Sequence, residues 1–220
     1  MSRPVAGLAV LALALGLLVA GAAGQAAAPL TRERALADIT SPDLDPRRRA
    51  AAWLGEVGAS ADAPVLIEAL SDADEVVRVL AERSIWQVWS RSGDAEADAL
   101  LQVGIEQMSR GDGPAAAETF TKVIQRRPDF AEAWNKRATV YFLMGEDEKS
   151  LRDCDEVMKR NPAHFGALAG YGQIYLRLDQ PERALSYFRR ALRINPNLRG
   201  VQQVIPQLEQ LLTERRKGTI

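Results

Sequence analysis

The sequence has very few of the side chains that usually build catalytic or metal sites. Its 220 residues include one cysteine, Cys154, and one histidine, His164. A single cysteine cannot form an internal disulfide, and one histidine without a nearby cysteine or second histidine cannot make a typical zinc site. No serine, histidine and aspartate can be combined into a hydrolase triad. We therefore predict no catalytic residue, no bound metal, no cofactor and no enzymatic activity.

The chain also lacks a large excess of charge of either sign. Lys and Arg total 28 and Asp and Glu total 29, which gives a formal net charge of −1. Domains that bind nucleic acid usually carry a basic stripe, so nucleic acid is not an expected partner. Gly166, Gly170 and Gly172 lie inside a predicted helix and do not follow a strand, so they do not form a phosphate-binding loop.

A regular spacing of prolines is the most informative feature that the sequence does contain. Pro128, Pro162 and Pro196 are equally spaced along the chain, and each closes an apolar segment of the same pattern. A period of this length, roughly 34 residues, is typical of stacked helix–turn–helix units. Such arrays present one long concave face that suits the binding of another chain. The spacing therefore predicts an all-α fold and an interaction role.

The three units resemble tetratricopeptide repeats, whose pattern is W-x2-L-G-x2-Y, then A-x3-F, then P. The last unit carries this pattern most fully, at Leu168, Gly172, Tyr175, Ala184, Phe188 and Pro196. Cys154 takes the phenylalanine position of the middle unit, where we expect a buried core residue. The resemblance covers residues 95–197 as three repeats. An apolar stripe then predicts a C-terminal capping helix at residues 198–217, which Pro206 should kink or break.

Residues 30–92 contain a second, shorter repeat. When its two copies are aligned, Arg47 superposes on Arg78 and Leu54 on Ile85, and the shared text resembles short HEAT-like repeats, also found in proteins related to bilin lyases. Together the two resemblances imply a right-handed helical-repeat solenoid of about two HEAT-like units, three tetratricopeptide units and a capping helix. We expect the two arrays to stack directly, with Trp86 and Trp89 sealing the joint.

Two helix starts can be predicted from capping boxes. Asp72 with Glu75 is expected to begin a helix in the upstream array, and Asp179 with Glu182 is expected to begin one in the last repeat.

The first residues are typical of a secretory signal peptide, predicted at residues 1–24. Residues 5–23 hold no charge, and small residues before Gln25 offer cleavage sites. No cysteine follows the apolar stretch, which excludes a lipoprotein. The expected location is periplasmic or secreted, with no membrane contact beyond the signal peptide. An uncleaved anchor formed by residues 5–23 is the alternative.

The tetratricopeptide resemblance also implies a binding face, because the concave wall of such domains comes mainly from the first helix of each repeat. Carried onto this sequence, the wall comprises Leu101, Ile105, Met108, Glu132, Asn135, Thr139, Phe142, Ala169, Gln173 and Leu176. Family members that grip a C-terminal carboxylate place Lys, Asn and Arg at set wall positions. Those positions here hold Leu101, Ile105, Lys136, Gly166 and Gly170, so that clamp is absent.

These patterns together favour an exported, non-catalytic adaptor or scaffold that binds a peptide or protein partner in its concave groove. The HEAT-like resemblance leaves a second possibility, an accessory or lyase-like protein that acts on a bound chromophore. A structural oligomer is the third. The sequence sets neither the partner nor the oligomeric state.

Overall fold

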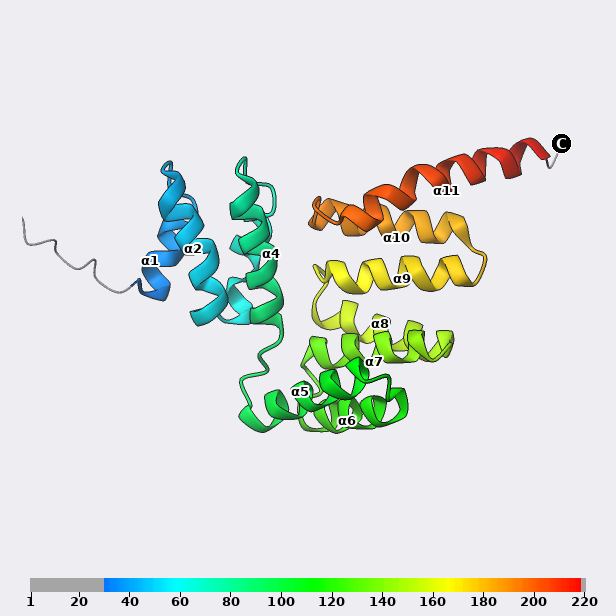
Figure 1. The fold of residues 1–220 in the computed structure, drawn as a ribbon, viewed down its shortest axis with the longest axis horizontal. Helices are drawn as coiled ribbons and strands as arrows, with labels where there is room; N and C mark the ends of the chain where they lie inside the picture. The colour runs from blue at the N-terminus through cyan, green and yellow to red at the C-terminus, as the bar shows by residue number, and fades with distance from the viewer. Residues whose placement is uncertain (1–29, 219–220) are drawn as a thin grey trace, which may run out of the picture.

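A computed structural model describes residues 30–218, and all regular structure in this part of the chain is helical (Figure 1). The predicted signal peptide lies outside the described residues. The helices are α1 (Arg32–Asp38), α2 (Leu44–Val57), the 3-10 helix η1 (Ser60–Asp62), α3 (Ala63–Ala69), α4 (Glu75–Trp89), α5 (Ala95–Ser109), α6 (Gly113–Arg126), α7 (Ala131–Leu143), α8 (Asp147–Arg160), α9 (Phe165–Arg177), α10 (Pro181–Ile194) and α11 (Arg199–Gly218). We call α1–α4 the N-terminal unit and α5–α11 the array. The predicted helical-repeat solenoid is confirmed.

Both helix pairs of the N-terminal unit are built in the same way. α3 follows α1 at the same interval in sequence as α4 follows α2. Arg47 donates to two backbone carbonyls of the turn before α2, and Arg78 donates to the two matching carbonyls before α4. Each arginine thus holds the turn in front of its own helix, which explains why the sequence repeats it.

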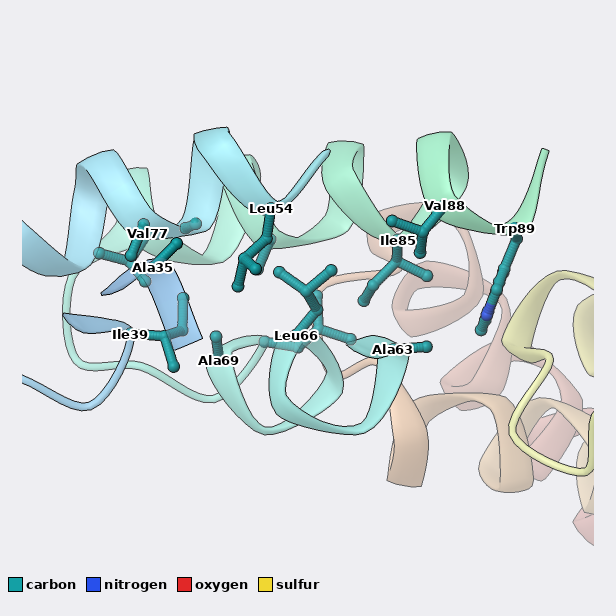
Figure 2. Close-up of a cluster of buried hydrophobic side chains, with 14 of the residues drawn as sticks. Ala35, Ile39, Leu54, Ala63, Leu66, Ala69, Val77, Ile85, Val88 and Trp89 are labelled. Carbon is teal, nitrogen blue, oxygen red and sulfur yellow. The ribbon is translucent and has the colours of Figure 1, made fainter. Parts of the chain in front are cut away.

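One apolar core joins the four helices of this unit. Figure 2 shows Leu54 of α2, Leu66 of α3 and Ile85 of α4 pointing toward one another, and all three are fully buried. Burying an aliphatic side chain of this size contributes about 1.5–3 kcal/mol relative to leaving it in water. Trp89, at the end of α4, belongs to the same core, together with Phe165 from the array.

Each repeat of the array packs a side chain of its second helix against a small residue of its first helix. A Cβ added to Gly104 would lie 2.5 Å from the Phe120 ring, and one added to Gly172 would lie 2.3 Å from the Phe188 ring. The middle repeat has Cys154 in the ring position, and this side chain is 2% exposed. Burial, with help from neighbouring carboxylates, raises the pKa of its thiol to about 12, so Cys154 is the neutral core residue that the sequence predicted.

The turn inside each repeat passes through one residue with a left-handed backbone. Gly111 and Gly145 take this position with φ of 80° and 79°, which glycine adopts without strain. In the last repeat the equivalent residue is Asp179, with φ of 54°. The prediction that Asp179 begins α10 is therefore wrong, and Gln180 is the N-cap.

The start of α4 also differs from the prediction. Asp74, and not Asp72, caps this helix, with its carboxylate accepting from the Val77 N–H at 3.0 Å. Asp72 instead accepts from the Asp74 N–H at 2.8 Å and pairs with Arg47 at 2.9 Å. Asp72 therefore holds the turn and connects it to Arg47 of the first helix pair, whereas Asp74 caps α4.

The N-terminal unit stands beside the array and does not continue it end to end (Figure 1). The chain leaves α4, reaches α5 at the far end of the array, and returns through the repeats, so that the last repeat meets the N-terminal unit. There Asn197, in the turn before α11, donates to the Leu70 carbonyl at 2.8 Å and accepts from Arg78 at 3.2 Å. The two parts therefore pack directly on each other, as expected, but they do so side by side at the last repeat.

The partners of two equivalent arginines, Arg47 and Arg78, explain this arrangement. Arg47 of the first helix pair binds Asp72 of the second pair, whereas Arg78, the matching residue of the second pair, has no third pair to bind. Asn197 of the array takes that place. The array thus caps the open end of the N-terminal unit.

α11 covers the last repeat at the position predicted for the capping helix. Its Val201, Leu208 and Leu212 are buried in a cluster with Phe188. Pro206 lies within the continuous helix Arg199–Gly218. It removes one backbone donor without ending the helix.

Candidate functional site

The first helices of the repeats, α5, α7 and α9, carry the residues predicted to bind a partner. Leu101, Glu132 and Asn135 are buried, with 0%, 1% and 8% of their surface exposed. Thr139 and Gln173 are exposed. The remaining predicted residues are half-buried, namely Ile105, Met108, Phe142, Ala169 and Leu176. A partner on this wall would therefore meet the exposed and half-buried side chains, while the three buried ones support the wall from behind.

Phe142, one of the predicted wall residues, already has a neighbour on its ring. The Arg177 guanidinium carbon lies 3.8 Å from the ring centroid, and Asp147 accepts from Arg177 Nε at 2.9 Å. A cation over an aromatic face is attracted by the ring quadrupole. A partner that uses Phe142 must share the ring with Arg177 or displace it.

Trp86 of α4 covers the wall at Gly166, where the chain offers no side chain. A Cβ added to Gly166 would lie 2.5 Å from the far end of the Trp86 ring. Phe165 packs against the same ring with centroids 5.1 Å apart, and the Lys136 ammonium lies 5.8 Å from its centroid. The missing side chain at Gly166 is therefore space for the chain's own tryptophan. Trp86 lies at a joint, as expected, but the joint is at the last repeat.

A buried charged cluster lies next to this joint. The Glu132 carboxylate approaches His164 Nε2 at 3.0 Å and accepts from Asn135 Nδ2 at 3.1 Å through the same oxygen. Its other oxygen lies 3.0 Å from the Lys136 ammonium, without a well-oriented hydrogen bond. The His164 ring stacks on Trp89 with centroids 4.5 Å apart. These contacts connect α7, α9 and the end of α4.

The protonation of this cluster follows from its bonds. Burial alone would raise the pKa of Glu132, but the His164 hydrogen bond and the charge of Lys136 outweigh it and hold this pKa below its usual 4.5. The ionised carboxylate therefore accepts from His164 Nε2. His164 Nδ1 in turn accepts from the Ala167 N–H at 3.0 Å and caps α9. One ring nitrogen thus binds Glu132 of α7 and the other caps α9, so both fix the start of α9 and the cluster has a structural role.

Sequence reasoning missed this pair, because Glu132 and His164 are 32 residues apart and no motif links them. Glu132 reads as a surface glutamate of an exposed wall. The one available signal is the lone histidine directly before a predicted helix, a position that suits capping.

A cavity of about 450 Å³ opens between the N-terminal unit and the turns before α7 and α9. Three arginines line it, and each already has a partner. Arg91 donates to a backbone carbonyl of the α2–η1 turn at 2.8 Å, Arg127 pairs with Asp129 at 3.1 Å, and Arg160 pairs with Glu156 at 2.6 Å. These guanidinium groups therefore shape the cavity wall, and each is held by a partner of this chain.

Within residues 30–218, no three or more His, Cys, Asp and Glu side chains come together in a way that would hold a metal ion. None of the described helices combines the length and the apolar character that a membrane span requires.

Comparisons with known proteins agree with the repeat pattern. Family models described as tetratricopeptide repeat match residues 101–157 and 165–198. A TPR repeat-containing protein of Rhizobium etli is 34% identical over 128 residues, which cover 58% of this chain and 63% of that relative. This chain therefore spans less than two thirds of that relative's length.

Two solved structures show the same fold in the array. The TPR domain of Sgt2 from Aspergillus fumigatus superposes with a TM-score of 0.54 at 18% identity, over 58% of this chain and 85% of that one. The first TPR domain of Spaghetti (RPAP3), bound to the HSP90 peptide SRMEEVD, superposes with a TM-score of 0.52 at 22% identity, over 55% and 96%. The array of this protein therefore has the fold of these TPR domains, and its residues 101–157 and 165–198 match the tetratricopeptide repeat in sequence.

Proposed function

We propose that this protein is a non-catalytic interaction module that binds a peptide segment of a protein partner on the inner wall of the array. The observation that carries the proposal is the row of accessible side chains on α5, α7 and α9. It combines hydrogen-bonding groups, Thr139 and Gln173, with half-buried apolar groups such as Ile105 and Leu176. The likeness to a domain that holds an HSP90 peptide supports a peptide as the class of ligand.

The partner segment differs from the chaperone tail in that complex, because the positions that would grip a terminal carboxylate are unsuitable here. Leu101 is buried and apolar. Lys136 is paired with Glu132, and Gly166 lies under Trp86. We therefore propose that an internal segment binds, since it needs no cationic clamp for a chain terminus.

We further propose that the protein is exported and that the N-terminal unit is a pair of short HEAT-like repeats. The uncharged stretch at residues 5–23 and the small residues before Gln25 support export. The equivalent roles of Arg47 and Arg78 support the repeat. Mass spectrometry of the protein from its native host should find a mature N-terminus near Gln25. An intact Met1 in a membrane fraction would instead favour the anchor.

Affinity purification from the envelope fraction tests the binding role. Gln173→Arg places a large charged side chain on the wall, and Ser186→Arg places the same side chain on the exposed surface of α10 as a matched control. Both positions are exposed, so both variants should melt like the parent. The proposal expects a partner that the control captures and that Gln173→Arg loses. Equal capture by both variants contradicts binding on the wall, and a coloured copurifying ligand would support the chromophore alternative.

A further inference from the structure

A groove in the N-terminal unit lies between α2 and α4. It has a volume of about 340 Å³, and its apolar surface comes from Leu30, Trp53 and Leu80. Trp53 is 37% exposed, an unusual position for a side chain that contributes so much when it is buried. The groove therefore offers a partly open tryptophan as an anchor.

Two arginines border this groove, and neither has a partner. Arg49 and Arg83 are exposed and make no hydrogen bond or ion pair within residues 30–218. The other arginines of the N-terminal unit all have a partner, namely Arg32, Arg34, Arg47, Arg48, Arg78 and Arg91. The one carboxylate that lines the groove, Glu56, accepts from Gln87 at 3.2 Å. The unpaired positive charge of the unit is therefore concentrated where its tryptophan is open.

The groove is also continuous with the array. Arg83 and Gln87 line a second hollow, between α4 and α5, that includes Gln102 and Ile105 of the first repeat. Ile105 belongs to the predicted inner wall. A single extended segment can therefore pass from the wall, over Arg83, into the groove.

We propose that this groove binds an acidic segment with large apolar side chains in the same partner that occupies the array, an inference that rests on the proposed function. Carboxylates would pair with Arg49 and Arg83, since guanidinium groups bind carboxylates with two parallel hydrogen bonds. An apolar side chain would pack on Trp53 and Leu80. Residues 1–29 of this chain contain no Asp or Glu, so they supply no carboxylate side chain for these arginines.

Fluorescence anisotropy with labelled synthetic peptides tests this assignment on the full chain. The probe carries two leucines among aspartates. One matched peptide replaces the aspartates with lysines, and another replaces the leucines with serines. The groove should bind the probe and neither matched peptide. Equal binding of the serine peptide, or no measurable binding of the probe, overturns the assignment.

The protein variants locate the binding. The double variant Arg49→Glu and Arg83→Glu, called the groove pair, should bind the probe about tenfold more weakly or worse. Each substitution replaces a charge-assisted hydrogen bond with repulsion between two negative charges. The control pair Arg152→Glu and Arg193→Glu makes the same change of net charge at exposed positions of α8 and α10 and should retain the parental affinity. An equal loss of probe affinity in both double variants would show that the attraction is only general electrostatics, and it would overturn the proposed site.

The same experiment separates this inference from the proposed function. If the copurified partner is lost by Gln173→Arg but not by the Arg49→Glu and Arg83→Glu pair, the wall binds and the groove does not. If the groove pair no longer binds the probe while Gln173→Arg still copurifies the partner, the groove is a binding site and the proposal of binding on the wall fails. A second copy of this chain is the remaining possible occupant, and light scattering detects it. Dimerisation that the groove pair abolishes would assign the groove to the second copy.

Discussion

Replacing Gly166 with alanine tests the docking of the N-terminal unit on the array. The new Cβ would lie 2.5 Å from the Trp86 ring, and that ring is held by Trp89 and Phe165 at centroid distances of 5.6 and 5.1 Å. Overpacking of this kind costs about 1–3 kcal/mol. Alanine also favours a helix over glycine by about 1 kcal/mol, so the single variant should lose at most about 2 kcal/mol.

The coupling between two substitutions removes this ambiguity. Trp86→Ala should itself cost about 3 kcal/mol, the low end for a tryptophan because the ring is only half-buried. In that background the clash with the Trp86 ring disappears and only the tight contact with His164, at 3.2 Å, remains, so Gly166→Ala should become close to neutral. The coupling free energy should therefore be about 1–3 kcal/mol. Urea unfolding of the four proteins measures it, provided that the slope with denaturant stays constant.

A control in the same helix makes the result decisive. A Cβ at Gly170 would meet only the Cys154 sulfur, at 3.8 Å. Gly170→Ala should therefore gain up to about 1 kcal/mol from helix propensity in both backgrounds. If Gly166→Ala and Trp86→Ala add within about 0.5 kcal/mol, or if the two glycine variants behave alike, Trp86 does not occupy the wall in solution.

Four further outcomes are expected. The two units should melt in one transition, because Phe165 lies in their shared core; two separate calorimetric peaks would contradict this. The pKa of Glu132 is lowered below 4.5, so its stabilisation is complete above that pH and is lost on acidification; Glu132→Gln should then lose less stability than the parent between about pH 6 and pH 3 in urea unfolding. Asp179→Gly should gain about 0.5–1 kcal/mol, because a side chain in the left-handed region costs about 1–2 kcal/mol and the freer glycine backbone offsets part of that gain. Asp179→Asn loses the same exposed pair with Arg215 but keeps a side chain, so it should gain less; equal melting temperatures would argue against strain there. Cys154 should react with a thiol reagent only after unfolding, because it is buried and its pKa is raised to about 12.

The repeats could be predicted from the sequence because their contacts are local. Gly104 and Phe120 lie in adjacent helices of one repeat, and the constant period places the matching positions in register in every repeat. The docking of the N-terminal unit depends on contacts of another kind. Asn197 binds Arg78 and Leu70 across 119 and 127 residues of sequence. A single asparagine in a turn carries no periodic signal, so the side-by-side arrangement could not be predicted.

The candidate site shows the same division. The helical register places the predicted wall on α5, α7 and α9, because it depends on position within the repeat. Exposure depends on neighbours distant in sequence. Glu132 would face solvent in an isolated helix, but His164 and Lys136 supply partners that allow its burial. Gly166 suggests an open surface, and only the fold reveals that Trp86 fills it.

The energy of this docking limits how a partner can bind. Undocking α4 from α9 to free the wall at Gly166 would expose Phe165, now fully buried, together with much of Trp86 and Trp89. At about 1.5–3 kcal/mol for each large apolar side chain, this costs about 5–8 kcal/mol. A peptide with micromolar affinity gains only about 8 kcal/mol in total. A partner that undocked α4 in this way would therefore retain almost no net affinity. The proposed binding role thus depends on the surfaces that Trp86 leaves open, such as those of Ile105 and Thr139.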